Sequence, residues 1–222
     1  MNDGTNGARL QHAAALCGIA GYVDAVGYFQ FGHVFTANMT GNTVLLGASL
    51  VRGDAIALTY AGTLAEFALG VMMAVILKRK GIGVYWAMAA NAVVLAALCL
   101  VAPSNLIVLL TLAGAMGLQG GTISSFSGIR LPTVVVTSTL VSLIEGVMLR
   151  ASPPTNGPAP PTTQHVQHLA VAWLIYGVGG AGAVAAERMS FPLLVPALVY
   201  LWVAWDLRQR ARMPKDALAR SP

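Results

Sequence analysis

Long apolar runs recur along this chain, and they restrict its fold more than any other feature. Several of them approach or exceed the ~18 residues at which an apolar segment predicts a transmembrane helix. The composition agrees, because 56% of the 222 residues are hydrophobic and only 9% are charged, whereas soluble domains carry roughly 25% charged residues. Outer-membrane barrels instead alternate apolar and polar residues in short segments. We therefore expect an all-α membrane protein that forms a single membrane domain over residues 1–222.

Two shorter elements interrupt the series of spans. Residues 33–50 are rich in small and polar residues, and residues 132–150 begin with Pro132 and lie between Arg130 and Arg150. We interpret both as broken, re-entrant elements that enter and leave on the same side. The six predicted transmembrane helices are residues 12–31, 54–77, 83–101, 105–126, 166–186 and 190–207.

The positive charges lie between the spans rather than in a cluster with aromatic residues. A net charge of +5 would suit a nucleic-acid partner, but RNA-binding segments interleave basic and aromatic residues, and this pattern is missing here. Lys and Arg instead gather in cytoplasmic loops of membrane proteins. With six crossings and two re-entrant elements, only Arg52 and Arg188 fall outside. This arrangement predicts cytoplasmic N- and C-termini, a basic tail over residues 208–222 and no nucleic-acid partner.

The two halves of the chain resemble each other weakly. Residues 21–25 match residues 117–121, and residues 40–46 match residues 137–143. The repeats would be residues 12–101 and 105–207, each with three crossings, so that the second copy is inverted relative to the first. Inverted repeats with discontinuous helices are typical of transporters. Gly and Thr are also common in membrane helices for packing reasons alone, which is the alternative explanation.

Asp24 places a carboxylate near the middle of the first span. A charge inside an apolar span indicates a functional site by default, here a proton or cation site, or a partner for a polar ligand. The alternative is a carboxylate that Tyr22, Tyr28 or polar groups of the neighbouring broken element satisfy. Glu66 lies near the middle of its own span. It either shares a proton with Asp24, binds a substrate cation, or hydrogen-bonds a neighbouring helix.

The break itself contains Asn38, Thr40, Gly41 and Asn42. Gly permits unusual backbone angles, and Asn and Thr accept hydrogen bonds from the first amides of a helix. A helix that starts near Asn42 would point free N–H groups at the midplane, where they favour an anionic or strongly polar group. A Thr/Gly-rich helix contact is the alternative. The matching half-site would hold Gln119, Ser124, Thr137 and Ser138, which bind only by hydrogen bonds or serve ordinary helix packing.

Residues 21–42 also carry a family resemblance. The pattern Gly-x-x-Asp-Ala, followed by Val-Phe-x-Ala-Asn-x-Thr-Gly-Asn, resembles the first hallmark of the YoaK family, a domain of unknown function. The second hallmark, Gly-x-Gln-Asn-Ala followed by Thr-Thr-x-x-Thr-Gly, is only partly present. Gln119 fits, Gly120 and Gly121 replace Asn-Ala, and Ser138 replaces the Gly. The resemblance covers residues 12–208 and implies a multi-pass protein of the bacterial inner membrane, without supplying a substrate.

These patterns predict a transporter of a small polar or anionic solute, proton-coupled at Asp24, in the lipid bilayer. A passive channel and a non-transporting membrane partner or assembly protein are the alternatives. No nucleophile–base pair, phosphate loop or metal cluster is visible, so we expect no enzyme, cofactor or metal. The glycines over residues 177–182 serve either internal packing or a homodimer. The predicted pathway residues are Asp24, Tyr28, Asn38, Thr40, Gly41, Asn42, Glu66, Gln119, Ser124, Thr137 and Ser138.

Overall fold

The structure is a computed structural model that describes residues 3–101, 104–123, 136–151, 161–186 and 188–212. Every regular element in these ranges is an α-helix. Long apolar segments give this result because a backbone in lipid must satisfy its hydrogen bonds internally. The helices are α1 (Asp3–Gln30), α2 (Met39–Arg52), α3 (Ala57–Arg79), α4 (Val84–Val101), α5 (Asn105–Thr122), α6 (Val136–Ala151), α7 (Thr163–Ala185) and α8 (Leu194–Arg212).

Four of these helices, α3, α4, α5 and α7, are long and apolar enough to cross a membrane. The all-helical membrane architecture is therefore confirmed. The first helix is longer than the predicted span of residues 12–31, because α1 already begins at Asp3. A helix propagates more easily than it nucleates, so the apolar part of α1 extends into its polar leader.

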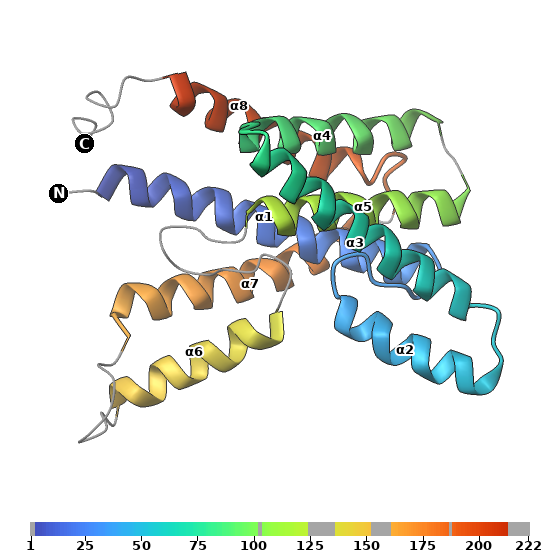
Figure 1. Cartoon of the computed structure of the whole chain (residues 1–222). Coiled ribbons are helices and arrows are strands. Elements are labelled where there is room, and N and C mark those ends of the chain that lie inside the picture. The colour runs from blue at the N-terminus through green and yellow to red at the C-terminus, as the bar shows by residue number, and fades with distance from the viewer. Residues whose placement is uncertain (1–2, 102–103, 124–135, 152–160, 187, 213–222) are drawn as a thin grey trace.

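Three helix pairs dominate the packing. α1 packs along α7, α3 along α5, and α4 along α8. In Figure 1, α1 and α7 both run away from the end that holds the termini, whereas α3 and α5 both run back toward it. The short helix α2 packs on α3, and α6 packs on α7. The bundle therefore consists of long paired helices with one half-length helix beside each of two pairs.

Glycines bring the paired backbones into contact. A side chain on Gly21 of α1 would overlap the carbonyl oxygen of Tyr176 of α7, and one on Gly117 of α5 would overlap that of Phe67 of α3. Small residues allow this close approach in membranes, where packing contacts rather than water drive helix association. The glycines of α7 thus have a packing role inside the chain: Gly179 lies against the backbone of Gly18.

A buried polar network holds the centre of the bundle together. Gln119 is fully buried; its amide nitrogen donates to the carbonyl oxygen of Leu16 at 3.1 Å, and its amide oxygen accepts from the Tyr200 hydroxyl at 2.5 Å. Asn91 donates to the carbonyl oxygen of Ala115 at 3.0 Å. Buried polar groups need such partners. These bonds connect α1, α4, α5 and α8.

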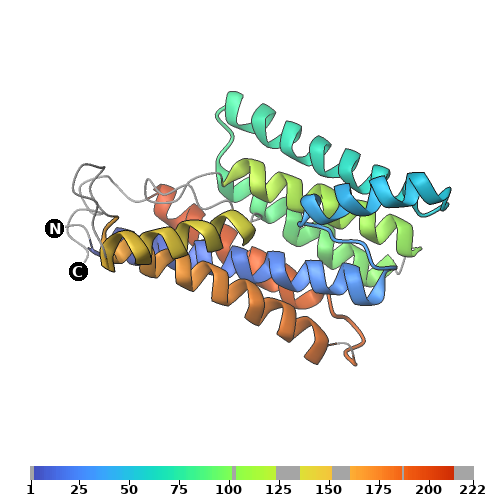
Figure 2. The same ribbon diagram turned by 90° about the horizontal axis from the view of Figure 1, so that it is seen from below.

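The two half-length helices begin near the middle of the bundle and extend toward opposite ends. Figure 1 shows α2 running outward on the right and α6 outward on the left, and the view from below in Figure 2 agrees. α2 has 14 residues and α6 has 16, both below the roughly 20 that a spanning helix needs. Their helix N-termini, which carry partial positive charge, therefore point toward the interior.

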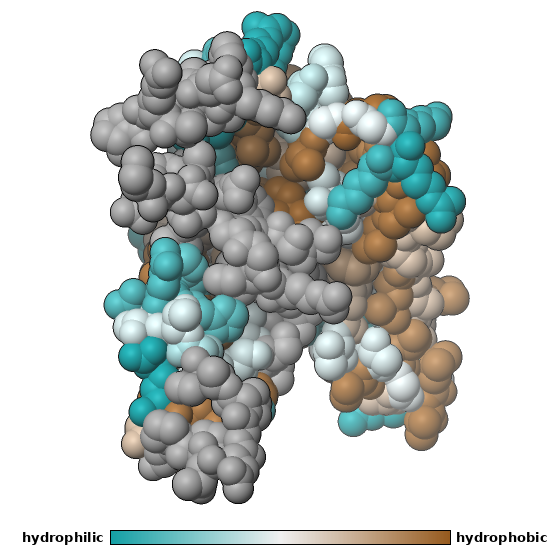
Figure 3. All heavy atoms as spheres, turned by 60° about the vertical axis from the view of Figure 1, so that its left-hand side comes forward, coloured by the Kyte–Doolittle hydropathy of each residue, from teal (hydrophilic) through white to brown (hydrophobic). Residues whose placement is uncertain are grey.

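The flanks of the bundle are hydrophobic and its ends carry the charges. Figure 3 shows hydrophobic residues covering much of the right-hand flank, with hydrophilic residues along its edges. Lys78 and Arg79 end α3, Arg150 lies in the last turn of α6, and Arg210 lies in that of α8. All three helices end on the side where Figure 1 places both chain termini. This distribution suits a protein whose long axis crosses a bilayer.

Candidate functional site

The Asp24 carboxylate forms the centre of a compact site between α1, α2 and α7. One of its oxygens accepts hydrogen bonds from three successive backbone amides, those of Thr36 at 2.8 Å, Ala37 at 2.6 Å and Asn38 at 3.2 Å. The other oxygen accepts from the Tyr176 hydroxyl at 2.5 Å. The residue is only 3% exposed. The Thr36 hydroxyl adds a longer bond to the first oxygen at 3.5 Å. Five hydrogen bonds from four residues therefore compensate the buried carboxylate, and no cation among the described residues contributes.

The chain reaches this carboxylate through a turn at the end of α1. Gly32 and His33 both adopt positive φ angles, 94° and 61°, which is routine for Gly but uncommon for His. Gly27 leaves room for the segment that follows this turn, because a side chain at residue 27 would meet the carbonyl oxygen of Val34. The turn folds residues 34–38 back along α1, so that their amides face Asp24.

Two asparagines fix the start of α2. Asn38 is the N-cap, and its side-chain oxygen accepts from the Gly41 amide at 3.3 Å. Asn42 is fully buried and brackets Phe35: its oxygen accepts from the Phe35 amide at 3.0 Å and its nitrogen donates to the Phe35 carbonyl at 2.6 Å. An Asn at a helix start satisfies amides that would otherwise lack partners. The predicted asparagines thus shape the break itself.

The remaining predicted residues of the first half surround this site without joining it. Tyr28 stacks on Phe35 with ring centroids 4.9 Å apart and meets His33 edge-on at 5.0 Å. Gly41 lies beside the Phe35 ring, where its missing side chain leaves room. Thr40 is exposed. Of the alternative partners named for Asp24, the polar groups of the neighbouring broken element do satisfy it, through the amides of residues 36–38. Tyr22 does not, because its hydroxyl donates to the carbonyl oxygen of Pro192 at 2.7 Å.

The other predicted residues lie elsewhere. Gln119 bonds to Leu16, which precedes Asp24 by eight residues, or about 12 Å along the helix axis. Glu66 lines a groove between α3, α4 and α5 and does not share a proton with Asp24, whose oxygens face other groups. Ser124 lies outside the described residues. Thr137 and Ser138 fall in the first turn of α6, and their side chains are likewise outside the description.

Two residues that contribute to the site, Tyr176 and Thr36, were not predicted from the sequence. Tyr176 directly precedes the glycine-rich part of α7, and Thr36 belongs to the motif but was assigned no role. The short spacing of Gly18 and Gly21 indicates that α1 closely approaches a partner helix. A tyrosine in a second glycine-rich helix was therefore a candidate for the missing donor.

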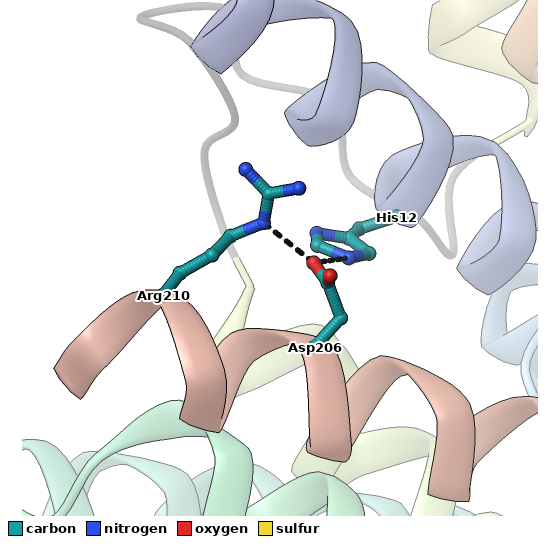
Figure 4. A network of polar contacts seen from close by, with 3 residues as sticks. All are labelled: His12, Asp206 and Arg210. Atoms are coloured by element: carbon teal, nitrogen blue, oxygen red, sulfur yellow. Dashed lines mark hydrogen bonds and ion pairs between the residues drawn. The ribbon is translucent and has the colours of Figure 1, made fainter. Parts of the chain in front are cut away.

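A second polar cluster joins α1 to α8 at the end that holds the termini. Figure 4 shows His12, Asp206 and Arg210 converging: one Asp206 oxygen lies 2.9 Å from His12 Nε2 and 2.5 Å from Arg210 Nε. The ring centroids of His12 and Trp202 also lie 5.5 Å apart. His12 is buried, and its contacts are with α8 rather than with the Asp24 site. The cluster ties the first helix to the last.

Chemically, the Asp24 site is an anion-binding nest that is filled by the protein's own carboxylate. Successive amides at a turn that leads into a helix N-terminus favour negative charge, and here the negative charge comes from α1. Among the described residues, no group of three or more His, Cys, Asp or Glu could hold a metal ion.

Comparison with known proteins agrees with the motif. The family described as "Protein of unknown function (DUF1275)" matches residues 12–205. The chain belongs to this family. Among curated proteins, the "UPF0700 transmembrane protein YoaK" of Bacillus subtilis (strain 168) is 33% identical over 147 residues, which cover 60% of this chain and 64% of that protein. The aligned region is thus less than two thirds of the relative. No solved structure matches the chain.

The comparisons confirm the expected YoaK-like family and place this DUF1275 protein in a membrane. They assign no activity.

Proposed function

We propose that this DUF1275 protein is a membrane transporter for a small polar or anionic solute, with proton coupling at Asp24. One observation carries the proposal: three backbone amides and a tyrosine hydroxyl converge on a carboxylate at the start of a half-length helix. An acid inside an apolar span is costly. Transporters commonly place such groups at discontinuous helices near the midplane.

The coupling follows from competition for the same donors. Ionised Asp24 occupies the amides of Thr36, Ala37 and Asn38. Protonation removes its charge and so weakens these charge-assisted bonds, which are roughly twice as strong as neutral ones. A solute anion can then take the freed amides at the positive end of α2. Proton and anion therefore bind together rather than in competition.

The proposed architecture is six crossing helices with α2 and α6 as re-entrant elements in an inverted repeat. In this repeat, α1 to α4 correspond in order to α5 to α8. The packed pair of α1 and α7 then corresponds to the pair of α5 and α3, and the pair of α2 and α3 corresponds to that of α6 and α7. The close backbone contacts at glycines correspond in the same way. The contact of Gly21 with Tyr176 matches that of Gly117 with Phe67. The contact of Gly179 with Gly18 matches that of Gly70 with Gly114. Repeats of this kind support alternating access.

The repeat also supports a site between the two broken elements. The starts of α2 and α6 both lie near the middle of the bundle in Figures 1 and 2. By the positive-inside rule, the end with both termini and the Lys78–Lys80 cluster would face the cytoplasm of a bacterial cell. Residues 208–222 would then be a cytoplasmic basic tail.

Proton-coupled flux in proteoliposomes tests the proposal. Liposomes loaded with a pH-sensitive dye receive an inward gradient of nitrate or chloride, with valinomycin and equal potassium holding the membrane potential at zero. We expect the lumen to acidify with the wild-type protein and with Glu145→Gln, which removes an exposed carboxylate of α6. We expect no acidification with Asp24→Asn.

Other outcomes separate the alternative functions. Anion uptake without acidification would indicate a passive channel. Absence of flux for both anions, and for urea and glycerol as neutral polar probes, would contradict transport and favour a membrane partner or assembly protein. Equal acidification by the wild type and Asp24→Asn would remove Asp24 from the mechanism.

A further inference from the structure

A second candidate site lies on the flank of the bundle, away from Asp24. The helices α3, α4 and α5 enclose a groove of about 450 Å³, within the range of small-molecule sites of roughly 300–1,000 Å³. Its walls are mostly apolar and include Leu69, Met73 and Ile107. Its polar side chains are Glu66, Asn91 and Thr111. Asn91 is already bonded to the backbone of α5, so Glu66 and Thr111 remain for a ligand.

Glu66 is the acid of this groove. It lies in the middle of α3, a helix apolar enough to span a membrane. Its carboxylate lies over Gly114, with Oε2 3.7 Å from the position that a Cβ would take there. Within the described part of the chain, no hydrogen bond or ion pair reaches this carboxylate. An acid at this depth needs a compensating group, and the described residues around it do not provide one.

The groove opens on the outer surface of the bundle. Leu69, Met73 and Ile107 are each about half exposed on the outer surface of the bundle, at 51%, 50% and 53%. Apolar side chains with this exposure face acyl chains in a bilayer. A ligand with an apolar body can therefore enter sideways from the membrane.

The opposite flank provides an internal comparison. A groove of about 520 Å³ lies between α1, α7 and α8, which are the helices that correspond to α5, α3 and α4. Its lining includes Ala15, Gly18, Gly182 and Val199, and it contains no acidic residue. The carboxylate thus distinguishes one groove from its counterpart, and general packing requirements of the fold do not explain it.

We propose that the groove of α3, α4 and α5 binds a cationic amphiphile, a protonated primary amine on an alkyl chain. The ammonium group has three donors and no acceptor, and it would pair with the Glu66 carboxylate in a charge-assisted bond. The Thr111 hydroxyl accepts a second donor. The alkyl chain packs against Leu69, Met73 and Ile107. This proposal does not depend on transport at Asp24, because neither Asp24 nor its partners line the groove.

Binding of dodecylamine to the purified chain tests the proposal. The protein is placed in nanodiscs of zwitterionic lipid, and its melting temperature is measured with dodecylamine and with dodecanol, which shares the chain but lacks the charge. We expect dodecylamine to raise the melting temperature of the wild type and of Glu145→Gln by several degrees more than dodecanol does. We expect Glu66→Gln to lose this difference.

A photoreactive dodecylamine locates the site in the wild-type protein and requires no variant to fold. Crosslinks to α3 and α5 that excess dodecylamine prevents would support the proposal. Crosslinks confined to α1, α7 and α8, or a stabilisation that is unchanged in Glu66→Gln, would overturn it. If a second copy of the chain covers the groove, the amine cannot enter it, and the wild-type protein shows neither stabilisation nor crosslinks. That result would also overturn the proposal.

Discussion

Replacing Asp24 by alanine is the most direct test of the site's geometry. The substitution removes the acceptor of five hydrogen bonds, three from the amides of residues 36–38, one from the Thr36 hydroxyl and one from Tyr176. Each buried donor left without a partner costs about 1–3 kcal/mol. The turn over residues 31–38 can shift and recover part of this loss. We therefore expect the free energy of unfolding to fall by about 3–5 kcal/mol, as when one partner of a buried charged pair is removed.

Replacing Asp24 by asparagine should cost less. The amide oxygen still accepts from the three backbone amides, and the Tyr176 hydroxyl can rotate to accept from the amide nitrogen. Only the charge assistance is lost, so we expect a cost of about 1–2 kcal/mol. Tyr176→Phe removes a single donor and should cost a similar amount. Because one substitution weakens and the other removes the contact between residues 24 and 176, the double variant should cost about 1 kcal/mol less than the sum of the two.

Unfolding by SDS in mixed micelles, followed by far-UV circular dichroism, measures these differences. Glu145→Gln is the control, since it converts an exposed carboxylate to an amide and breaks no bond among the described residues. We expect it to change stability by no more than about 0.5 kcal/mol. If Asp24→Ala falls within 1 kcal/mol of this control, the hydrogen bonds to Asp24 do not stabilise the fold.

Three further predictions concern the supporting contacts. Gly21→Ala places a methyl group against the carbonyl oxygen of Tyr176, so overpacking should lower the stability of the fold by about 1–3 kcal/mol. Gly177→Ala is its control, because a methyl group there meets nothing within 4 Å. Thermal denaturation should show no change for Gly177→Ala. Asn42→Ala removes both bonds to Phe35 and should cost about 1–3 kcal/mol, measurable as faster hydrogen exchange of the Phe35 amide; unchanged exchange would contradict it. His12→Ala should cost about 1–2 kcal/mol because a buried partner of Asp206 is lost, while Arg210→Ala, a more exposed partner, should cost about 0–1 kcal/mol; an SDS titration that reverses this order would contradict the assignment.

The helical elements followed directly from the sequence because hydrophobic length decides which segments enter a bilayer. The half-length character of α2 was also predictable, since polar residues interrupt its apolar run. Its start was predicted to within one turn, since a helix was expected to begin near Asn42 and α2 begins at Met39. Residues 34–38 leave the helix because their amides bond to Asp24, and this is a tertiary interaction that local propensity does not encode.

The partner of Asp24 was harder to predict than Asp24 itself. Tyr28, one turn later in α1, was within reach by helical spacing, but its ring stacks on Phe35 instead. The actual partner, Tyr176, is 152 positions away. Its location depends on how α1 and α7 cross, and a single sequence shows only that both helices contain glycines that permit a close crossing.

Tyr176 links two features that otherwise look separate. Its backbone carbonyl packs against Gly21, whose lack of a side chain lets α7 approach α1 closely. Its hydroxyl donates to Asp24, which lies less than one turn after Gly21 in α1. The same carboxylate holds the turn that precedes α2. A sliding of α7 along α1 would therefore change the hydrogen bonds of Asp24, and a change at Asp24 would alter the contact between α1 and α7. In the proposed transporter this connection allows protonation of one side chain to bias both the broken helix and the packing of the two halves.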